Sequence, residues 1–184
     1  LNAATGADFF SLSIGSVIIT RFENMGDVND DGYTDIIPAH SSIDMTQVID
    51  GYDGETIWSQ PTADQPWNVA PCGDITGDAI PDVFVGTLYQ SNYCYFLNGE
   101  NGTELTTPIS YGEAVDAIAA IPAVVNDGSM VMMVGGRNGK LSCYSGGKVT
   151  AQQVRISANF TATPLSGVAP LQVVFTDLST AENT

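Results

Sequence analysis

The segment Gly26-Asp27-Val28-Asn29-Asp30-Asp31-Gly32-Tyr33-Thr34-Asp35-Ile36-Ile37 defines the architecture of the chain, because it occurs twice. It returns as Gly73-Asp74-Ile75-Thr76-Gly77-Asp78-Ala79-Ile80-Pro81-Asp82-Val83-Phe84, with Asp74 47 residues after Asp27. Residues 48–54 match residues 96–102 at a spacing of 48, and residues 1–6 match residues 97–102 again. A third, weaker copy runs from residue 117 to residue 147. Self-similarity at such a period predicts a repeat protein.

Each copy is expected to form four short strands. In the second copy they span residues 67–71, 82–86, 92–98 and 104–110, where valine, isoleucine and aromatic residues gather between Gly, Asn and Asp. No segment has a sustained helical period. The pattern predicts an all-β fold of β-propeller blades, each with four antiparallel strands. A two-sheet sandwich is the alternative, but it does not explain the repeat.

The repeat divides the chain into blades at residues 16–63, 64–112 and 113–150, with residues 1–15 as the last strand of a preceding blade. Propellers close with about 4 to 8 blades, so about three blades form a partial propeller. We expect further blades before residue 1; the alternative is that other chains complete the sheet. Open blade edges would otherwise pair with neighbouring strands, which allows self-assembly.

The composition excludes several classes of partner. Asp and Glu number 21 against 5 Lys and Arg, and the formal net charge is −16. Such a surface repels phosphate backbones, so we expect no nucleic-acid binding. No apolar run approaches the roughly 20 residues that cross a bilayer, so we expect no membrane insertion. Cys72, Cys94 and Cys143 fit no zinc spacing and are interpreted as small strand hydrophobes.

The repeated loop has the ligand pattern of a calcium site. Asp27, Asn29, Asp31 and Asp35 stand at positions 1, 3, 5 and 9 of the loop, and the carbonyl of Tyr33 adds a ligand at position 7. Gly32 permits the sharp turn. These hard oxygen donors favour Ca²⁺ over metals that prefer His or Cys. Pro38 stands where a helical calcium sensor would carry a bidentate glutamate.

The second loop predicts a weaker calcium site. Its ligands would be the side chains of Asp74, Thr76, Asp78 and Asp82 and the carbonyl of Ile80. Ala79 replaces the glycine of the first loop. The third copy has Ala123 and Val131 in place of the first and last aspartates, so we expect it to bind no metal. The alternative is that both loops are metal-free Asx-turns.

These residues resemble the FG-GAP repeat, the blade unit of integrin α-subunit propellers and of many prokaryotic surface proteins. The family's D-x-D/N-x-D-G-x-x-D pattern is matched in full by residues 27–35 and imperfectly by residues 74–82. Residues 49–58 and 1–6 also resemble the docking motif of quinoprotein-like blades, in which an Asp, a Gly and a Trp tie neighbouring blades together. The first copy has all three, and the second has Leu105 or Thr106 where Trp58 would lie.

Residues 160–179 resemble the opening of a PKD domain, an immunoglobulin-like β-sandwich of prokaryotic cell surfaces. Leu171, Val173 and Phe175 alternate as a half-buried strand should. Residues 151–184 are therefore expected to be a linker and the first strands of a truncated sandwich, because a whole one needs roughly 100 residues.

Together these features favour a non-catalytic, calcium-stabilised propeller on the surface of a bacterium or archaeon. It would serve adhesion, binding or filament and sheath assembly, with other protein subunits or cell-surface glycans as partners. Sequons at Asn101 and Asn159 allow N-glycans. The alternative is a propeller enzyme, such as a quinoprotein-like dehydrogenase or a polysaccharide lyase. The chain has few cations and one histidine, His40, which we interpret as a surface residue at a strand end.

Overall fold

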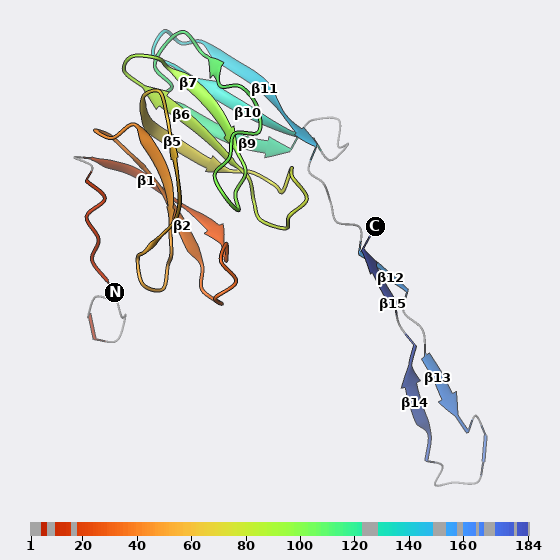
Figure 1. Ribbon diagram of the computed structural model, residues 1–184. Coiled ribbons are helices and arrows are strands. Elements are labelled where there is room, and N and C mark those ends of the chain that lie inside the picture. Colours follow the sequence, from red (N-terminus) through yellow and green to blue (C-terminus); the bar gives the residue numbers. More distant parts are fainter. Residues whose placement is uncertain are drawn as a thin grey trace. The chain divides into compact units, whose positions relative to one another are not determined.

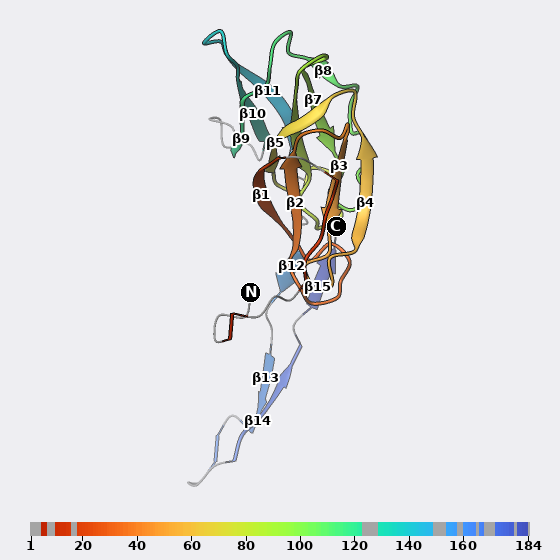
Figure 2. The same ribbon diagram turned by 90° about the vertical axis from the view of Figure 1, so that its left-hand side faces the viewer.

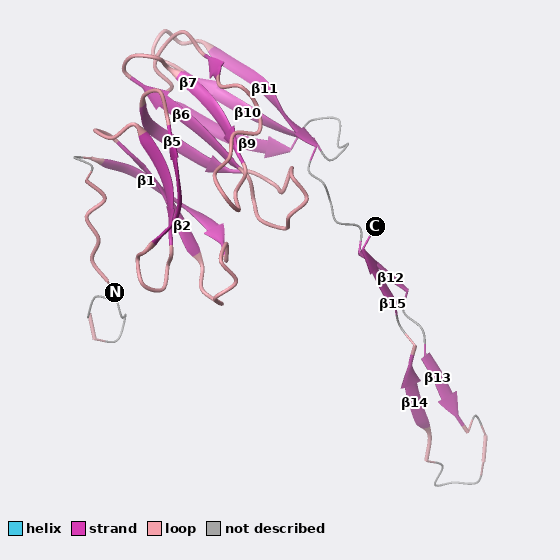
Figure 3. Cartoon of the chain, in the orientation of Figure 1, coloured by secondary structure: helices cyan, strands magenta, loops and turns pink. Residues whose placement is uncertain are grey.

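The structure is a computed structural model that describes residues 5–6, 10–15, 18–122, 129–148, 154–157, 160–164, 166–167, 172–178 and 180–183. The chain divides into two compact units, residues 1–150 and residues 151–184. The described residues are strands and loops, with no helix among them (Figure 3). Accordingly, no described segment is a helix long and apolar enough to cross a membrane.

Two four-stranded antiparallel sheets correspond to the first two copies of the repeat (Figure 1). Sheet 1 has the order β1 (Ile19–Gly26), β2 (Asp35–His40), β3 (Met45–Ile49) and β4 (Thr56–Pro61), seen side by side in Figure 2. Sheet 2 has the order β5 (Gln65–Pro71), β6 (Val83–Leu88), β7 (Tyr93–Leu97) and β8 (Ile109–Ser110). The all-β prediction with four antiparallel strands per repeat is confirmed for these copies.

The fourth predicted strand of the second copy, residues 104–110, is interrupted. Glu104 forms an isolated bridge with Leu97, and the ladder resumes only at β8. Pro108 precedes β8 and has no N–H to donate to a ladder, so a continuous strand cannot form there.

The third copy forms a three-stranded sheet, sheet 3. Its order is β11 (Leu141–Lys148), β10 (Ser129–Gly135) and β9 (Ala117–Pro122). By sequence position, these strands correspond to β7, β6 and β5. Among the described residues no fourth strand pairs with β11.

Residues 151–184 contain two separate strand pairs. β12 (Val154–Ser157) pairs with β15 (Thr180–Asn183), and β13 (Phe160–Thr163) pairs with β14 (Val174–Asp177). Phe175 is 68% exposed, so the predicted half-buried alternation is wrong here: a two-stranded hairpin offers no second layer. Leu171, the first residue of the predicted strand, lies outside the described residues.

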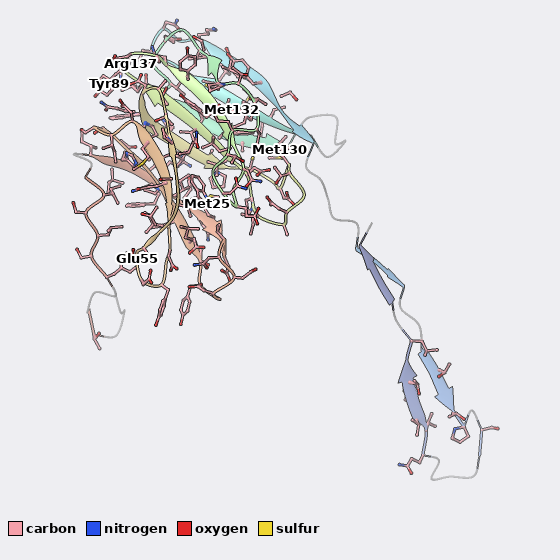
Figure 4. All side chains as sticks on the ribbon, in the orientation of Figure 1. Met25, Glu55, Tyr89, Met130, Met132 and Arg137 are labelled. Atoms are coloured by element: carbon pink, nitrogen blue, oxygen red, sulfur yellow. The ribbon has the colours of Figure 1, made fainter. Side chains whose placement is uncertain are left out.

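The core lies between the sheets in two clusters, because sheet 2 is buried on both faces. Its strands alternate between the clusters, so that Val83 and Val85 face sheet 1 while Phe84 faces sheet 3. Met25 belongs to the first cluster and Met132 to the second, and Figure 4 labels both. Cys72 and Cys94 are buried in the second cluster and Cys143 is exposed; all three are free thiols. The interpretation as strand hydrophobes therefore holds for Cys94, which lies in β7, whereas Cys72 is buried directly after the end of β5.

Trp58 of sheet 1 packs on the β7–β8 turn of sheet 2. Its indole Nε1 donates a hydrogen bond to the carbonyl oxygen of Gly99 at 2.8 Å. A Cβ on Gly102, whose φ is +75°, would lie 2.5 Å from the indole ring. A larger residue in place of Gly102 would therefore push the Trp58 ring away. Because Gly102 has no side chain, the indole packs directly on the backbone of the turn.

His40 is buried rather than exposed, contrary to the expectation from its place at a strand end. It is fully inaccessible at the end of β2, and neither ring nitrogen has a hydrogen-bond partner. Burial lowers the pKa of the imidazole below its usual value, so the folded protein holds the ring neutral.

Replacing Trp58 should destabilise unit 1, because the indole packs on the β7–β8 turn and donates a hydrogen bond to it. We expect Trp58→Ala to cost about 3–5 kcal/mol in the free energy of unfolding, from lost packing and an unpaired Gly99 carbonyl. The matched control, Tyr52→Ala, removes an exposed ring and should cost less than about 1 kcal/mol. Urea denaturation measures both; equal losses would contradict the docking role.

The buried His40 should make the protein less stable in mild acid. The unfolded state takes up a proton near pH 6.5 and the folded state does so only at lower pH. The free energy of unfolding should therefore fall as the pH drops below about 6.5, with a slope of up to about 1.4 kcal/mol per pH unit. Denaturation of the wild type and of His40→Leu, both in chelator, checks this. Parallel pH profiles for the two proteins would contradict it.

Candidate metal centre

The two aspartate loops connect equivalent strands and follow the same backbone path. One joins β1 to β2 and the other joins β5 to β6. Asp30 and Gly32 have φ values of 59° and 90°, and their equivalents Gly77 and Ala79 have 89° and 73°. Ala79 is strained, because a left-handed conformation costs an L-residue about 1–2 kcal/mol. Each loop thus has one glycine and one other residue in this conformation, and Asp30 of the first loop adopts it more easily than Ala79 of the second.

The first aspartate of each loop accepts hydrogen bonds from backbone N–H groups later in the same loop, so that the loop curls around its carboxylate. Asp27 Oδ1 accepts from the N–H of Asp31 at 3.0 Å, and Asp27 Oδ2 from the N–H of Gly32 at 2.8 Å. In the second loop, Asp74 Oδ2 accepts from the N–H of Ala79 at 2.9 Å, and Asp74 Oδ1 from the N–H of Asp78 at 3.2 Å. The predicted first ligands therefore close both loops.

The last aspartate of each loop is buried and joins three segments of its sheet. Asp35 Oδ2 accepts from the N–H of Val28 at 2.7 Å, and Asp35 Oδ1 from the N–H of Gly51 at 3.0 Å. In the second loop, Asp82 accepts the equivalent hydrogen bonds from the N–H groups of Ile75 at 2.6 Å and Gly99 at 3.0 Å. Each carboxylate thus holds the start of its loop and the turn after the third strand.

Burial raises the pKa of both carboxyls, and the backbone hydrogen bonds oppose the shift. Neighbouring carboxylates raise it further, namely Asp50 and Asp31 around Asp35 and Asp78 beside Asp82. The two loops therefore concentrate negative charge that a nearby cation would relieve.

Two glycines that the sequence analysis did not single out make this arrangement possible. A Cβ on Gly51 would collide with the carbonyl oxygen of Thr34, and one on Gly99 with that of Pro81. The sequence contains a signal for these glycines, because they occupy equivalent places in the matching segments 48–54 and 96–102. They also follow the last loop aspartates, Asp35 and Asp82, at nearly the same spacing.

The middle ligands bond to a further polar side chain after the third strand. Asn29 Nδ2 donates to Asp50 Oδ2 at 2.7 Å in the first copy. In the second copy the residue equivalent to Asp50 is Asn98. Its Nδ2 donates to Asp78 Oδ2 at 2.7 Å. Asp50 thus contacts the loop, although it was not among the predicted ligands.

The remaining predicted ligands lie inside the same loops. The N–H groups of Tyr33 and Ile80 donate to Oδ1 of Asp31 and Asp78 at 2.8 Å and 2.9 Å. Thr76 Oγ1 lies 3.4 Å from both Asp74 Oδ1 and Asp82 Oδ1. All ten predicted ligands are therefore in two local networks, five in each.

The chemistry of both networks fits a hard divalent cation, since every candidate donor is an oxygen. Their present arrangement is held by backbone N–H groups, and nowhere in the described residues do three His, Cys, Asp or Glu side chains gather as a preformed metal cluster. In the third copy, Val131 lies within β10 and Ala123 lies outside the described residues. Of the two sequons, Asn101 is exposed in a turn and Asn159 is not described.

Gly99→Ala should destabilise the protein strongly, because the new Cβ would force apart the turn and the backbone at Pro81. We expect a loss of about 2–3 kcal/mol or more in the free energy of unfolding. Gly135→Ala is the matched control, since its Cβ would meet nothing closer than 3.8 Å and φ is ordinary there; it should change stability by less than about 0.5 kcal/mol. Urea denaturation of both variants checks this, and a tolerated Gly99→Ala would contradict the close approach.

Comparison with known proteins gives a fold but no family. No family model matches the chain, and no curated protein matches its sequence. Among solved structures, the chain is similar to BBS1N in a crystal structure of its complex with ARL6DN soaked with mercury, at 14% identity and a TM-score of 0.51. The match covers 72% of this chain and 43% of that chain, so this chain spans less than half of the solved one.

A lead-soaked crystal of the same complex gives 18% identity, a TM-score of 0.38, and coverage of 74% of this chain and 54% of that chain. The likeness to the mercury-soaked structure shows the fold alone. With the antiparallel sheets described above, it confirms the predicted fold class: the chain has an all-β fold of β-propeller type.

Proposed function

We propose that the chain is a non-catalytic, calcium-stabilised propeller module that acts at the cell surface by binding other proteins or glycans. The observation that carries the proposal is the twofold occurrence of one aspartate loop, with the same backbone path and the same buried last aspartate. Ordinary turns do not need a buried carboxylate surrounded by further carboxylates. A bound cation gives this arrangement a physical reason.

Calcium is the ion that suits the loops best. Neither loop contains a Lys or Arg to neutralise its aspartates. In the first site Ca²⁺ would be held by side-chain oxygens of Asp27, Asn29, Asp31 and Asp35 and the carbonyl of Tyr33; in the second, by those of Asp74, Thr76, Asp78 and Asp82 and the carbonyl of Ile80. The ion would neutralise carboxylates that repel one another. The first site would be stronger, because Asn29 offers an amide oxygen where the second loop has Thr76, and because Ala79 adopts its left-handed conformation less easily than Asp30 does.

The proposed place of action follows from the calcium sites and the resemblances. Each loop offers three carboxylate ligands and lacks the bidentate glutamate of a helical calcium sensor, and sites with fewer charged ligands suit the high calcium concentrations outside cells. The loops resemble FG-GAP repeats and residues 160–179 resemble a PKD domain, both common on bacterial and archaeal surfaces. We therefore propose an extracellular module, with an N-glycan at Asn101 if the organism glycosylates such sites.

Binding rather than catalysis is supported by the chemistry of the described residues. The only histidine in the sequence, His40, is buried and out of reach of a substrate. Arg21 pairs with Glu23, and Arg137 pairs with Asp116 at 2.9 Å. The similar solved propeller is in complex with a protein. With a net charge of −16, the preferred partner of this chain would present a basic surface.

Removing calcium should lower the thermal stability of the protein. We expect the unfolding midpoint to fall in chelator and to recover with Ca²⁺ but not with equal Mg²⁺, because Mg²⁺ sheds its water reluctantly. Calorimetry measures the midpoints. An unchanged midpoint would mean that the loops are metal-free turns.

Single substitutions test whether the calcium-dependent shift of the unfolding midpoint arises from the aspartate loops. Asp31→Asn should reduce the calcium-dependent part of the midpoint shift, since it removes a charge from the first site. Asp53→Asn is the matched control, because Asp53 lies in the adjacent β3–β4 turn and accepts only from the N–H of Glu55 in this region. Equal responses of the two variants would place calcium elsewhere.

A further inference from the structure

Two exposed tyrosines stack on each other at the first aspartate loop. Tyr33 lies in this loop and is 52% exposed, and Tyr52 lies in the turn between β3 and β4 and is 58% exposed. Their ring centroids are 4.7 Å apart, and the ring planes are tilted by 32°. Because each ring holds the other in place, a ligand that stacks on the pair would immobilise little further. Tyrosine is also enriched among the residues that contribute most to binding at protein interfaces.

The fold does not require these rings, because the second copy of the repeat builds the same loop and turn without them. Ile80 stands in place of Tyr33, and Glu100 stands in place of Tyr52. The backbone N–H of each of these four residues donates to the equivalent side-chain oxygen of its own copy, at 2.6–2.9 Å. The tyrosine pair is therefore a feature of the first copy alone, and the loop and turn form without it.

The first copy also carries more negative charge around the pair. Residues 27–35 and 50–55 contain seven carboxyl groups and no Lys or Arg. The equivalent residues 74–82 and 98–103 contain four carboxyl groups. A Ca²⁺ ion in the first loop would offset two charges, so an excess of negative charge would remain beside the tyrosines with the ion bound.

The turn between β3 and β4 does not need its carboxylates for its shape. Asp53 accepts a hydrogen bond from the N–H of Glu55 at 2.9 Å, and in the second copy Asn101 accepts the equivalent bond from the N–H of Thr103 at 3.0 Å. A neutral amide thus closes the second turn as a carboxylate closes the first. Asp53 and Glu55 are exposed, and Figure 4 labels Glu55. Their charges are therefore available to a ligand.

We propose that the tyrosine pair and the carboxylates of this turn form a binding surface for arginine side chains of a partner protein. A guanidinium group stacks on an aromatic ring by cation–π attraction and donates paired hydrogen bonds to a carboxylate. Tyr33 and Tyr52 offer the rings, and Asp53 and Glu55 follow Tyr52 by one and three residues. The negative charge repels an acidic ligand. A neutral glycan would stack on the rings but would gain nothing from the charge.

The first experiment tests the ligand chemistry by isothermal titration calorimetry of residues 1–184 at low salt, where screening is weak. The probes are a hexaarginine peptide, a hexalysine peptide and maltohexaose. We expect hexaarginine to bind more tightly than hexalysine, because both carry the same charge but only the guanidinium is planar and stacks on a ring. Maltohexaose should not bind. Equal affinity for the two peptides, or binding of maltohexaose instead, would overturn the proposal.

The second experiment replaces the two rings by the residues of the second copy. Tyr33→Ile with Tyr52→Glu should weaken hexaarginine binding by about tenfold, although it adds a negative charge. The variant keeps the backbone of the loop, including the Tyr33 carbonyl proposed as a calcium ligand. Tyr89→Asn is the matched control, because it removes a 61% exposed ring from the β6–β7 turn, and it should leave the affinity unchanged. An unchanged affinity in the double variant, or an equal loss in the control, would refute the surface.

The third experiment removes charge from the turn without changing its shape. Asp53→Asn with Glu55→Thr should weaken hexaarginine binding by about fivefold, since each exposed ion pair contributes modestly. Asp44→Asn with Glu100→Gln is the matched control, because it removes two exposed carboxylates elsewhere. An equal loss in the control would mean that the peptide responds only to net charge, and the proposal would be wrong.

This inference rests on the proposed function in treating the chain as a binding module, but it does not require bound calcium. Titrations in calcium and in chelator, beside the unfolding midpoints, separate the two proposals. Peptide binding by a protein whose midpoint ignores calcium would refute only the calcium sites. A calcium-dependent midpoint without peptide binding would refute only the arginine surface. Asp53→Asn should weaken peptide binding and leave the calcium response of the midpoint unchanged.

Discussion

A buried carboxylate after each aspartate loop is the interaction on which each of the first two sheets depends. Asp35 and Asp82 bind the N–H groups at the start of their loop and at the glycine that follows the third strand. They tie the loop between the first two strands to the turn between the last two. Because the carboxyl group is buried, leaving its hydrogen bonds unmade is costly. The shape of the loop is therefore coupled to the shape of the sheet.

The same turns also hold neighbouring sheets together. Gly99 donates its N–H to Asp82 of its own sheet and offers its carbonyl oxygen to Trp58 of the sheet before it. One short segment thus fixes the loop, the turn and the packing of an indole from the adjacent blade. A cation in the loop would act on all three, so a modest local site can affect the stability of the whole stack. This is the physical basis for treating the proposed calcium as a scaffold ion.

The repeat predicted the fold because several segments match at nearly the same spacing, which chance similarity does not produce. The strands between the matching loops are also short and apolar. It did not predict where ladders break: Pro108 splits the last strand of sheet 2. Nor did it predict the burial of His40, because an isolated polar residue at a strand end gives no signal of what packs above it. The ten ligands were predicted from their spacing alone, and metal binding by them stays a prediction. Gly51 and Gly99 were missed because their role depends on contact with a distant backbone.

Hydrogen exchange of the Gly51 and Gly99 amides in the native protein tests the central claim most directly. Both amides follow strand ends, where exchange is ordinarily fast, and each donates to a buried carboxylate. The account predicts that they exchange as slowly as amides in the middle of β2 and β6, since opening them requires the sheet to open. Exchange as fast as in the exposed turns would contradict it, because the aspartates would then not hold the loops and turns together.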